Sequence, residues 1–577
     1  MRGDARAAAL RACDIRLVAA QAADGETHHV HRGSGQAHER CSSPSVINPT
    51  HGLCIDESSA LGWAVDAQKV YERRWKILAV MSLSLVVTLL NNVTVNVALP
   101  ELSKDLGADN TELQWIMDAY VVVFGGTLLV MGAFGDRFGR KPALLTGLAV
   151  VGLVSALTAL YATTSDHVIG ARAVMGLGAA LVMPATLSII VVVFPPEERA
   201  KAVGVWVGMA GIGAPIGLLV GGWVVENYDW RGVFWINPPI IALAMVMCIA
   251  LVPNSRDEKE TPMDPVGAAL SVGALGSILY AIIEGPSLGW TSDEVLGFGA
   301  LGVILTFLFV RWERRVEHPM LPIEFFRDRG FALGLVAISL AFFVMFSFMF
   351  TQMLHFQLVR GHTAFEAALR FLPLPLGLMP MAANSDRLCE KFGSNNVVAA
   401  GLTLVGAAML IFTTVEVGTD YVVLALIFLL IGMGMGLTMA PSTTMVMDSI
   451  PQDKAGVGSA TNDASREVGG AFGIAIVGSV LNEIYQSKLV VPGGLEEHSG
   501  IVSESFPAAM RIGGELFAQG NALGLELIEN ARWAFVEGMT DAAVAPAIVA
   551  LVNAILVKRY MPRNPGQVED ANLPTNS

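Results

Sequence analysis

The feature that most constrains this chain is its series of apolar runs, each about 20 residues long, the length at which a helix crosses a hydrocarbon layer. About fourteen such runs follow one another through most of the sequence. Charged residues make up only 15% of the 577 residues, whereas a soluble domain carries about 25%. The 59 glycines agree, because small residues let membrane helices approach closely. We therefore predict an all-α polytopic membrane protein.

The positions of lysine and arginine predict how the spans are oriented. When the N-terminus is placed inside, most basic residues beyond the first 65 fall in inner segments, as the positive-inside rule requires. An odd number of spans would remove this contrast, so we expect an even number, with both termini cytoplasmic, in the plasma (inner) membrane. The spans are expected to begin near Trp75, Thr111, Ala143, His167, Ala202, Val233, Asp264, Val295, Gly330, Ala364, Asn396, Tyr421, Ala455 and Trp533.

Residues 1–65 differ from the rest of the chain. They are rich in Ala, Ser, His, Gly and Arg without apolar periodicity, which predicts a disordered tail or an over-extended start. Charges interrupt every apolar stretch that a signal peptide would need. The five cysteines form no CxxC pair, and the histidines of His28–His31 are more typical of a solvated tail than of a metal site. We expect no metal and no nucleic-acid partner.

A weak internal repeat divides the chain into two halves. The stretch "GDRFGRK" (135–141) follows the second predicted span, and "SDRLCEKFG" (385–393) follows the tenth. This indicates two six-helix halves, 66–255 and 316–560, around two inserted spans in 256–315, with a cytoplasmic tail at 561–577. Repeated halves that rock about a central site are a common transporter architecture. The long outer loop 484–531 is expected to hold an amphipathic helix on the membrane surface.

Several motifs resemble one family. The pattern Gly132-x-x-x-Asp136-Arg137-x-Gly139-Arg140-Lys141 is similar to the signature inner loop of the major facilitator superfamily. The stretches "LLNNVTVNVALP", "WIMDAYVVVFG", "ARAVMGLGAALVMPA", "WRGVFWINPP" and "ATNDASREVGGAFGIAIVGS" resemble its 14-span drug:proton antiporter branch. The resemblance covers residues 70–560. It implies a multidrug exporter in which the inner loop latches the halves together in the outward-facing state.

The inner loop also has a physical interpretation of its own. Gly132 and Gly139 permit a tight turn and close backbone approach, and the basic residues anchor the loop at the inner face. Asp136 can pair with those bases or with a helix N-terminus. A plain topogenic loop would explain Arg140 and Lys141 but not Asp136 with the two glycines, so we favour the latch.

A stripe of glycines lies in "GVWVGMAGIGAPIGLLVGGW". Gly213, Gly217 and Gly221 recur every four residues on one helix face, where a partner helix can approach closely. The resembling family's antiporter motif is G-x-x-x-G-P-x-x-G-G. Here Gly222 also matches, but Leu218 occupies the proline position and Pro215 lies three residues earlier. The packing role is retained, while the motif's value as a sign of export is weakened.

Ionisable residues inside the predicted spans are few, and each costs about 2.5 to 3.5 kcal/mol at mid-membrane, which favours a functional role. We expect Asp118 to carry protons, and the resemblance implies that Arg172 assists. Asp463 and Arg466 lie on one helix face, where a functional pair and a structural ion pair remain equally open. Relatives commonly carry aspartate where Asn91 stands, so either Asp118 serves as the proton site, or coupling differs, or substrates are not the usual cations.

The sequence predicts a proton-coupled exporter of small amphipathic molecules or drugs that works by alternating access. It is expected to be a monomer embedded in lipid, with no cofactor beyond the proton gradient and no enzymatic activity; no phosphate-binding loop is present. An uptake carrier or facilitator for one metabolite is the alternative, and a non-transporting receptor or enzyme is a third hypothesis. Candidate cavity residues are Asn91, Trp115, Tyr120, Phe346 and Met349.

Overall fold

The computed structural model divides the chain into two compact units, Met1–Trp75 and Lys76–Ser577. The residues that the structure describes are 45–47, 54–106, 108, 110–255, 264–451 and 454–563. Part of the segment that we expected to be disordered is ordered here, because strands β1 (Ser45–Ile47) and β2 (Cys54–Asp56) form an antiparallel hairpin and helix α2 begins at Glu57. The predicted tail at 1–44 and 48–53, including His28–His31, lies outside the described residues.

The predicted N-terminal half consists of long helices joined by short turns. Proline at the first helical position and polar caps mark several of the starts: Thr164 accepts from a backbone N–H of α5, and Pro196 begins α6. The helices are α2 (Glu57–Leu106), α3 (Asn110–Phe138), α4 (Arg140–Tyr161), α5 (Ser165–Val193), α6 (Pro196–Asn227), α7 (Arg231–Trp235) and α8 (Asn237–Leu251).

The inserted pair and the predicted C-terminal half follow the same pattern. The inserted helices are α9 (Pro265–Leu288) and α10 (Asp293–Glu313). The remaining elements are η2 (Ile323–Arg327), α11 (Arg329–Leu354), η3 (His355–Val359), α12 (Ala364–Arg370), α13 (Pro373–Phe392), α14 (Ser394–Phe412), α15 (Tyr421–Asp448), α16 (Ala455–Lys488), η5 (Glu496–His498), α17 (Ser499–Glu504), α18 (Phe506–Ala518), α19 (Ala522–Ala542) and α20 (Val544–Tyr560).

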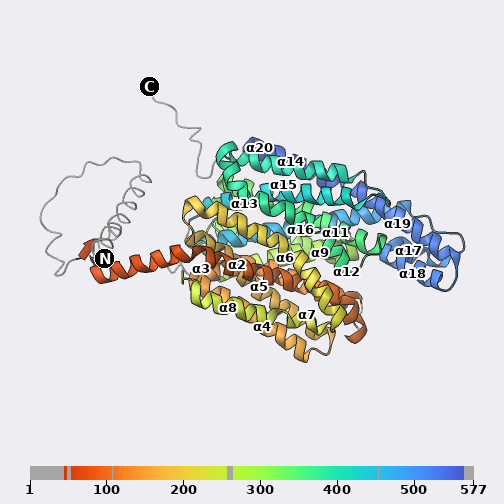
Figure 1. Cartoon of the computed structure of the whole chain (residues 1–577), viewed down its shortest axis with the longest axis horizontal. Helices are drawn as coiled ribbons and strands as arrows, with labels where there is room; N and C mark the ends of the chain where they lie inside the picture. The colour runs from red at the N-terminus through yellow and green to blue at the C-terminus, as the bar shows by residue number, and fades with distance from the viewer. Residues whose placement is uncertain are drawn as a thin grey trace, which may run out of the picture. The chain divides into compact units, whose positions relative to one another are not determined.

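The two halves meet through two equivalent pairs of contacts. Helix α6 of the first half packs against α13 and α15 of the second, and α16 of the second half packs against α3 and α5 of the first. Figure 1 shows α13, α14, α15 and α20 gathered on one side of the bundle and α4, α7 and α8 on the other. Inserted helix α9 contacts both α3 and α16, while α10 packs chiefly on α9.

Thirteen helical stretches among the described residues are long and apolar enough to cross a membrane. The expected tenth span, beginning near Ala364, lies outside that set because it is split into α12 and α13 and because α13 ends in charged residues. Helix α13 nevertheless packs inside the bundle against α6 and α15. The chain is thus an all-α polytopic membrane protein with about fourteen transmembrane helices.

The segment 484–531 differs from the long loop that we expected. Helix α16 continues to Lys488, and α19 already begins at Ala522, so the last span starts eleven residues before the expected Trp533. Helix α18 forms where we expected an amphipathic helix, but its apolar face packs against α19 rather than being left for lipid. A Cβ at Gly513 would lie 3.0 Å from the carbonyl oxygen of Gly524.

Candidate functional site

The carboxylate of Asp136 joins the two halves. It lies near the end of α3, and its two oxygens accept the backbone N–H groups of Gly456 (2.9 Å) and Val457 (3.1 Å) in the first turn of α16. Arg140 donates to the same carboxylate at 2.8 and 3.0 Å. A negative charge at a helix N-terminus satisfies N–H groups that have no partner within the helix and interacts favourably with the helix dipole. This contact joins the end of α3 to the start of α16, and the role of the loop as a latch stays a prediction.

Two glycines make that approach possible. A Cβ at Gly132 would lie 2.6 Å from the Cβ of Ala460 and 2.6 Å from the carbonyl oxygen of Gly456, so any side chain there would push α3 away from α16. Gly139 has a φ of +111°, a conformation that L side chains rarely adopt, and it turns the chain from α3 into α4.

The remaining basic residues of the loop act at other places. The ammonium of Lys141 donates to the carbonyl oxygens of Ile249 (2.9 Å) and Val252 (2.8 Å), where α8 ends. A cation at a helix C-terminus complements the dipole. The guanidinium of Arg137 lies 5.3 Å from the ring centroid of Phe138. The loop therefore ties together α3, α4, α8 and α16.

The glycine stripe of α6 packs against α2. A Cβ at Gly217 would lie 3.3 Å from the Cα of Leu90, and one at Gly221 would lie 3.2 Å from the Cα of Thr94. Gly213 faces Leu89 in the same way, and Gly222 faces Phe365 at a longer distance. Pro215 belongs to the same helix, and its side chain lies outside the described residues.

Arg172 of α5 is fully buried and tied to two neighbouring helices. Its guanidinium donates to the carbonyl oxygen of Ile116 (2.9 Å), to that of Asn91 (3.3 Å) and to the side chain of Asn92 (3.2 Å). It also lies 4.3 Å from the ring centroid of Tyr120, a cation–π contact. A buried charge is costly unless it is paired, so these contacts stabilise the guanidinium. They also hold Arg172 in one position.

The structure brings Asp118 and Arg172 together, which the sequence alone could not show. Asp118 is partly buried on α3 and interacts electrostatically with Arg172. Asn91 lies next to Arg172, because its carbonyl oxygen accepts from the guanidinium, while its side chain accepts from Asn237 at 2.9 Å and contacts the sulfur of Met175. Asn91 is thus part of a polar network inside the first half.

A second charged group lies in α16. Arg466 is 3.6 Å from the carboxylate of Asp463, donates to Thr443 at 3.2 Å, and lies between the rings of Trp206 and Phe342. Trp206 belongs to α6, so Arg466 touches both halves. The pair that we expected from the i, i+3 spacing is present, and the geometry leaves its structural and functional roles both open.

Sequence reasoning missed Glu467, which follows Arg466 in the same span. Glu467 is partly buried, and its charge interacts with both Arg466 and Tyr120. The signal was available, because a third ionisable side chain within "NDASREVGG" stands inside a long apolar helix. The interaction with Tyr120 links the charged group of α16 to α3, while Arg466 contacts Trp206 of α6 and Phe342 of α11.

The other cavity candidates lie in different environments. The ring of Trp115 is 5.8 Å from that of Tyr280 on inserted helix α9. Phe346 lies between α11 and α16, where a Cβ at Gly470 would meet its ring at 2.3 Å. Met349 is partly buried on α11. Of the five candidates, Tyr120 and Asn91 contact Arg172 on α5, Tyr120 with its ring and Asn91 with its carbonyl oxygen.

A comparison with family models identifies the family of this chain. The model described as Major Facilitator Superfamily matches residues 81–474. The chain belongs to the major facilitator superfamily. Superfamily members are built from two repeated halves, and in this chain α6 contacts α13 and α15 while α16 contacts α3 and α5.

Similar superfamily members come from several bacteria. "Multidrug efflux pump LfrA" of Mycolicibacterium smegmatis is 31% identical over 84% of this chain and 96% of that protein. "Puromycin resistance protein pur8" of Streptomyces alboniger is 32% identical over 82% of this chain and 93% of that protein. The crystal structure of the human organic anion transporter MFSD10 (TETRAN) shares the superfamily fold, with a TM-score of 0.53 and 14% identity over 83% of this chain and 99% of that one.

Proposed function

We propose that this protein is a proton-coupled secondary transporter that exports small amphipathic molecules or drugs by alternating access. Relatives that cover most of the chain are named for multidrug efflux and for antibiotic resistance. The observation that carries the proposal is a set of buried and partly buried carboxylates that interact with buried arginines: Asp118 with Arg172, and Asp463 and Glu467 with Arg466.

Such a set can couple proton movement to rocking of the halves. A carboxylate inside the membrane is stable when it is neutralised, either by a proton or by a nearby arginine. A rearrangement that separates a carboxylate from its arginine therefore favours proton uptake, and the reverse motion favours release. Protons that enter down the membrane potential supply about 2.3 kcal/mol per charge per 100 mV.

The proposal places the protein in the plasma (inner) membrane as a monomer surrounded by lipid, with both termini cytoplasmic and with the proton gradient in place of a cofactor. The latch between Asp136 and α16 then closes the cytoplasmic end. In this state the exporter would face outward.

An uptake carrier or facilitator for a specific metabolite is the second candidate. Two sequence features favour it, namely Asn91 in place of a titratable side chain and Leu218 in place of the antiporter proline. The side chain of Asn91 is an amide that donates and accepts hydrogen bonds but does not take up or release a proton, so it cannot replace the carboxylates described above.

The test is uptake into inside-out membrane vesicles under an imposed pH gradient, where cellular export appears as uptake. A fluorescent lipophilic cation and a neutral drug would be compared. We expect Asp118→Asn and Glu467→Gln each to reduce gradient-dependent uptake at least about tenfold, equivalent to about 1.4 kcal/mol in the activation barrier. Asp293→Asn, which removes an exposed carboxylate at the start of α10, is the matched control.

Each outcome separates the candidates. If both variants take up the probes at the wild-type rate, the coupling site lies elsewhere. Wild-type vesicles that accumulate neither probe under a gradient would contradict drug export and favour the metabolite carrier.

A further inference from the structure

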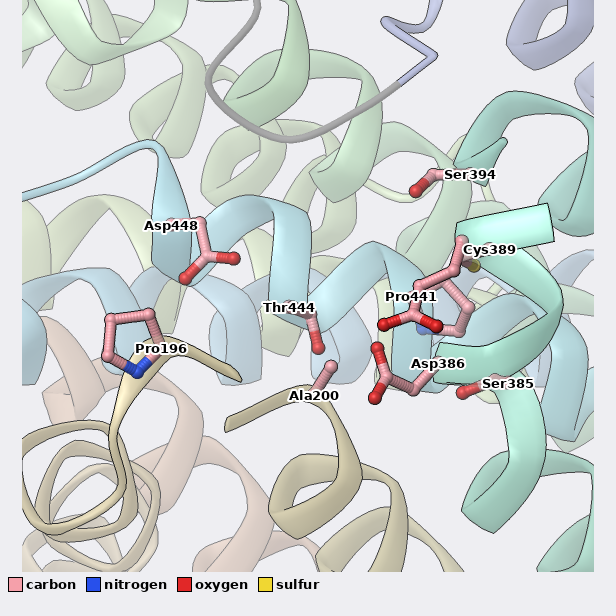
Figure 2. A pocket seen from close by; sticks show the side chains of 10 residues that line it. Pro196, Ala200, Ser385, Asp386, Cys389, Ser394, Pro441, Thr444 and Asp448 are labelled. Atoms are coloured by element: carbon pink, nitrogen blue, oxygen red, sulfur yellow. The ribbon is translucent and has the colours of Figure 1, made fainter. Parts of the chain in front are cut away.

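A cavity of about 400 Å³ lies between the halves at the predicted cytoplasmic end, and nothing in the proposed transport cycle uses it. We call it the acidic cavity. Figure 2 shows the side chains that line it, which come from α6, α13, α14 and α15: Pro196, Ala200, Ser385, Asp386, Cys389, Glu390, Ser394, Pro441, Thr444 and Asp448.

The internal repeat makes this cavity unexpected. Asp386 corresponds to Asp136, and α6 corresponds to α16, so a symmetric molecule would have Asp386 at the N-terminus of α6. Instead Asp386 and Pro196, the first residue of α6, lie on the wall of the same cavity. A cavity is therefore present beside Asp386 and the start of α6, whereas Asp136 contacts the start of α16 directly.

The charges on the wall have one sign. Three carboxylates line the cavity, and its lining contains no basic side chain. Arg199 forms an ion pair with Asp448 at 2.8 Å, so it does not neutralise Asp386 and Glu390. Lys201 and Arg387 attract Asp386 from outside the lining.

A buried hydroxyl directed at the cavity also indicates a ligand. Thr444 is 7% exposed, and its oxygen has no hydrogen-bond partner among the described residues. In Figure 2 it lies between the carboxylates of Asp448 and Asp386. A buried polar group without a partner costs about 1 to 3 kcal/mol, which a bound polar molecule or water would offset.

The spacing of the acids selects the kind of cation. Among the residues that the structure describes, no three His, Cys, Asp or Glu side chains converge as a metal site. The carboxylates are spread around a cavity of about 400 Å³. This volume suits an organic cation, because pockets for small molecules begin at about 300 Å³. Pro196, Ala200 and Pro441 offer apolar surface to the rest of such a molecule.

We propose that the acidic cavity binds small organic cations with an apolar body as they enter from the cytoplasm. Asp386 and Glu390 attract the charge, and Thr444 accepts or donates a hydrogen bond where the ligand is polar. The passage of such a cation onward rests on the proposed export function. Its binding in the cavity does not, so the two can be tested separately.

Cys389 is a reporter that the cavity itself provides, because its partly exposed thiol lines the wall. A chain with Cys13, Cys41, Cys54 and Cys248 replaced by alanine would retain this thiol alone. The rates at which cationic and anionic methanethiosulfonates modify it would be measured in inside-out and right-side-out vesicles without any pH gradient. Tetraphenylphosphonium would then be tested for protection against modification, with neutral triphenylphosphine oxide as the control.

In inside-out vesicles, we expect Cys389 to react faster with the cationic reagent than with the anionic one. We expect tetraphenylphosphonium, but not triphenylphosphine oxide, to protect it. Asp386→Asn with Glu390→Gln should reduce the ratio of cationic to anionic rates at least about threefold and abolish protection. Glu317→Gln removes an exposed carboxylate outside the cavity, so it should change neither the ratio of rates nor the protection of Cys389. The two single variants should give intermediate ratios if the double variant does not fold.

Other results would overturn the inference. Faster reaction with the anionic reagent would indicate an anion site at the start of α6. Protection by both compounds, by neither, or only in right-side-out vesicles would exclude a cytoplasmic cation site. Protection of Cys389 in vesicles that show no gradient-driven uptake would refute export while leaving the cation site intact.

Discussion

The pKa of the exposed Asp105 carboxylate depends on the side chains that donate hydrogen bonds to it. Trp230 donates to it at 2.7 Å and Arg231 at 3.1 Å. The hydrogen bond from Trp230, followed by that from Arg231, lowers the pKa of Asp105. Because the folded pKa lies below the unfolded one, the ionised group stabilises the fold above the unfolded pKa, and this contribution is lost as the pH falls through the folded pKa.

We therefore expect Asp105→Asn to lower the temperature of unfolding more at about pH 7 than at about pH 3, because the contribution of the ionised carboxylate shrinks as the pH falls. Thermal unfolding of the detergent-purified protein at both pH values would measure the difference. Glu497→Gln, which removes another exposed carboxylate, is the control for loss of a surface charge. A difference between Asp105→Asn and the wild type that is equally large at both pH values would show that the charge is not responsible.

At the scale of elements, the joint between α3 and α16 depends on the absence of a side chain. A Cβ at Gly132 would lie 2.6 Å from the Cβ of Ala460 and from the carbonyl oxygen of Gly456, and a backbone atom cannot move aside cheaply. The same displacement would pull the first turn of α16 away from Asp136.

We expect Gly132→Ala to cost about 1 to 3 kcal/mol of stability, as overpacking does, and to slow gradient-driven uptake in vesicles. Adding Ala460→Gly removes one of the two clashes and should restore part of both. Gly170→Ala in α5 is the control, because a Cβ there meets nothing within 4 Å. If Gly132→Ala transports at the wild-type rate, the close approach is not needed for the cycle.

At the scale of the whole molecule, the proposed rocking of the halves requires the contacts at their predicted cytoplasmic ends to separate. Arg199 of α6 and Asp448 of α15 form a 2.8 Å ion pair across the halves, whereas Arg231 and Asp105 form a 3.1 Å pair within one half. These two pairs provide a matched comparison.

Cysteines at 199 and 448, joined by a short cleavable crosslinker, should reduce uptake to background, and cleavage should restore it, because the halves can no longer separate. Cysteines at 105 and 231, joined in the same way, should leave uptake unchanged. Transport that continues with 199 and 448 joined would exclude rocking at this interface.

The sequence alone determined the solvent in which this protein folds and a bundle of about fourteen helices, while the division into two related halves stays a prediction. Runs of about 20 apolar residues have no other stable arrangement than helices in a bilayer, because every backbone polar group must be satisfied within its own segment. The split of the tenth span and the folding of 484–531 against α19 were not predictable in this way, since both depend on contacts between elements distant in the sequence.

Only the tertiary structure decided which charges meet. The composition of the inner loop predicted that Asp136 could bind a helix N-terminus, but the choice of α16 comes from packing across 320 residues. Asp118 and Arg172 were both predicted to take part in proton coupling, but their interaction depends on α3 and α5 lying side by side. Periodicity reveals which face of a helix is apolar, whereas the partner of a buried charge is set by the helix that packs against it.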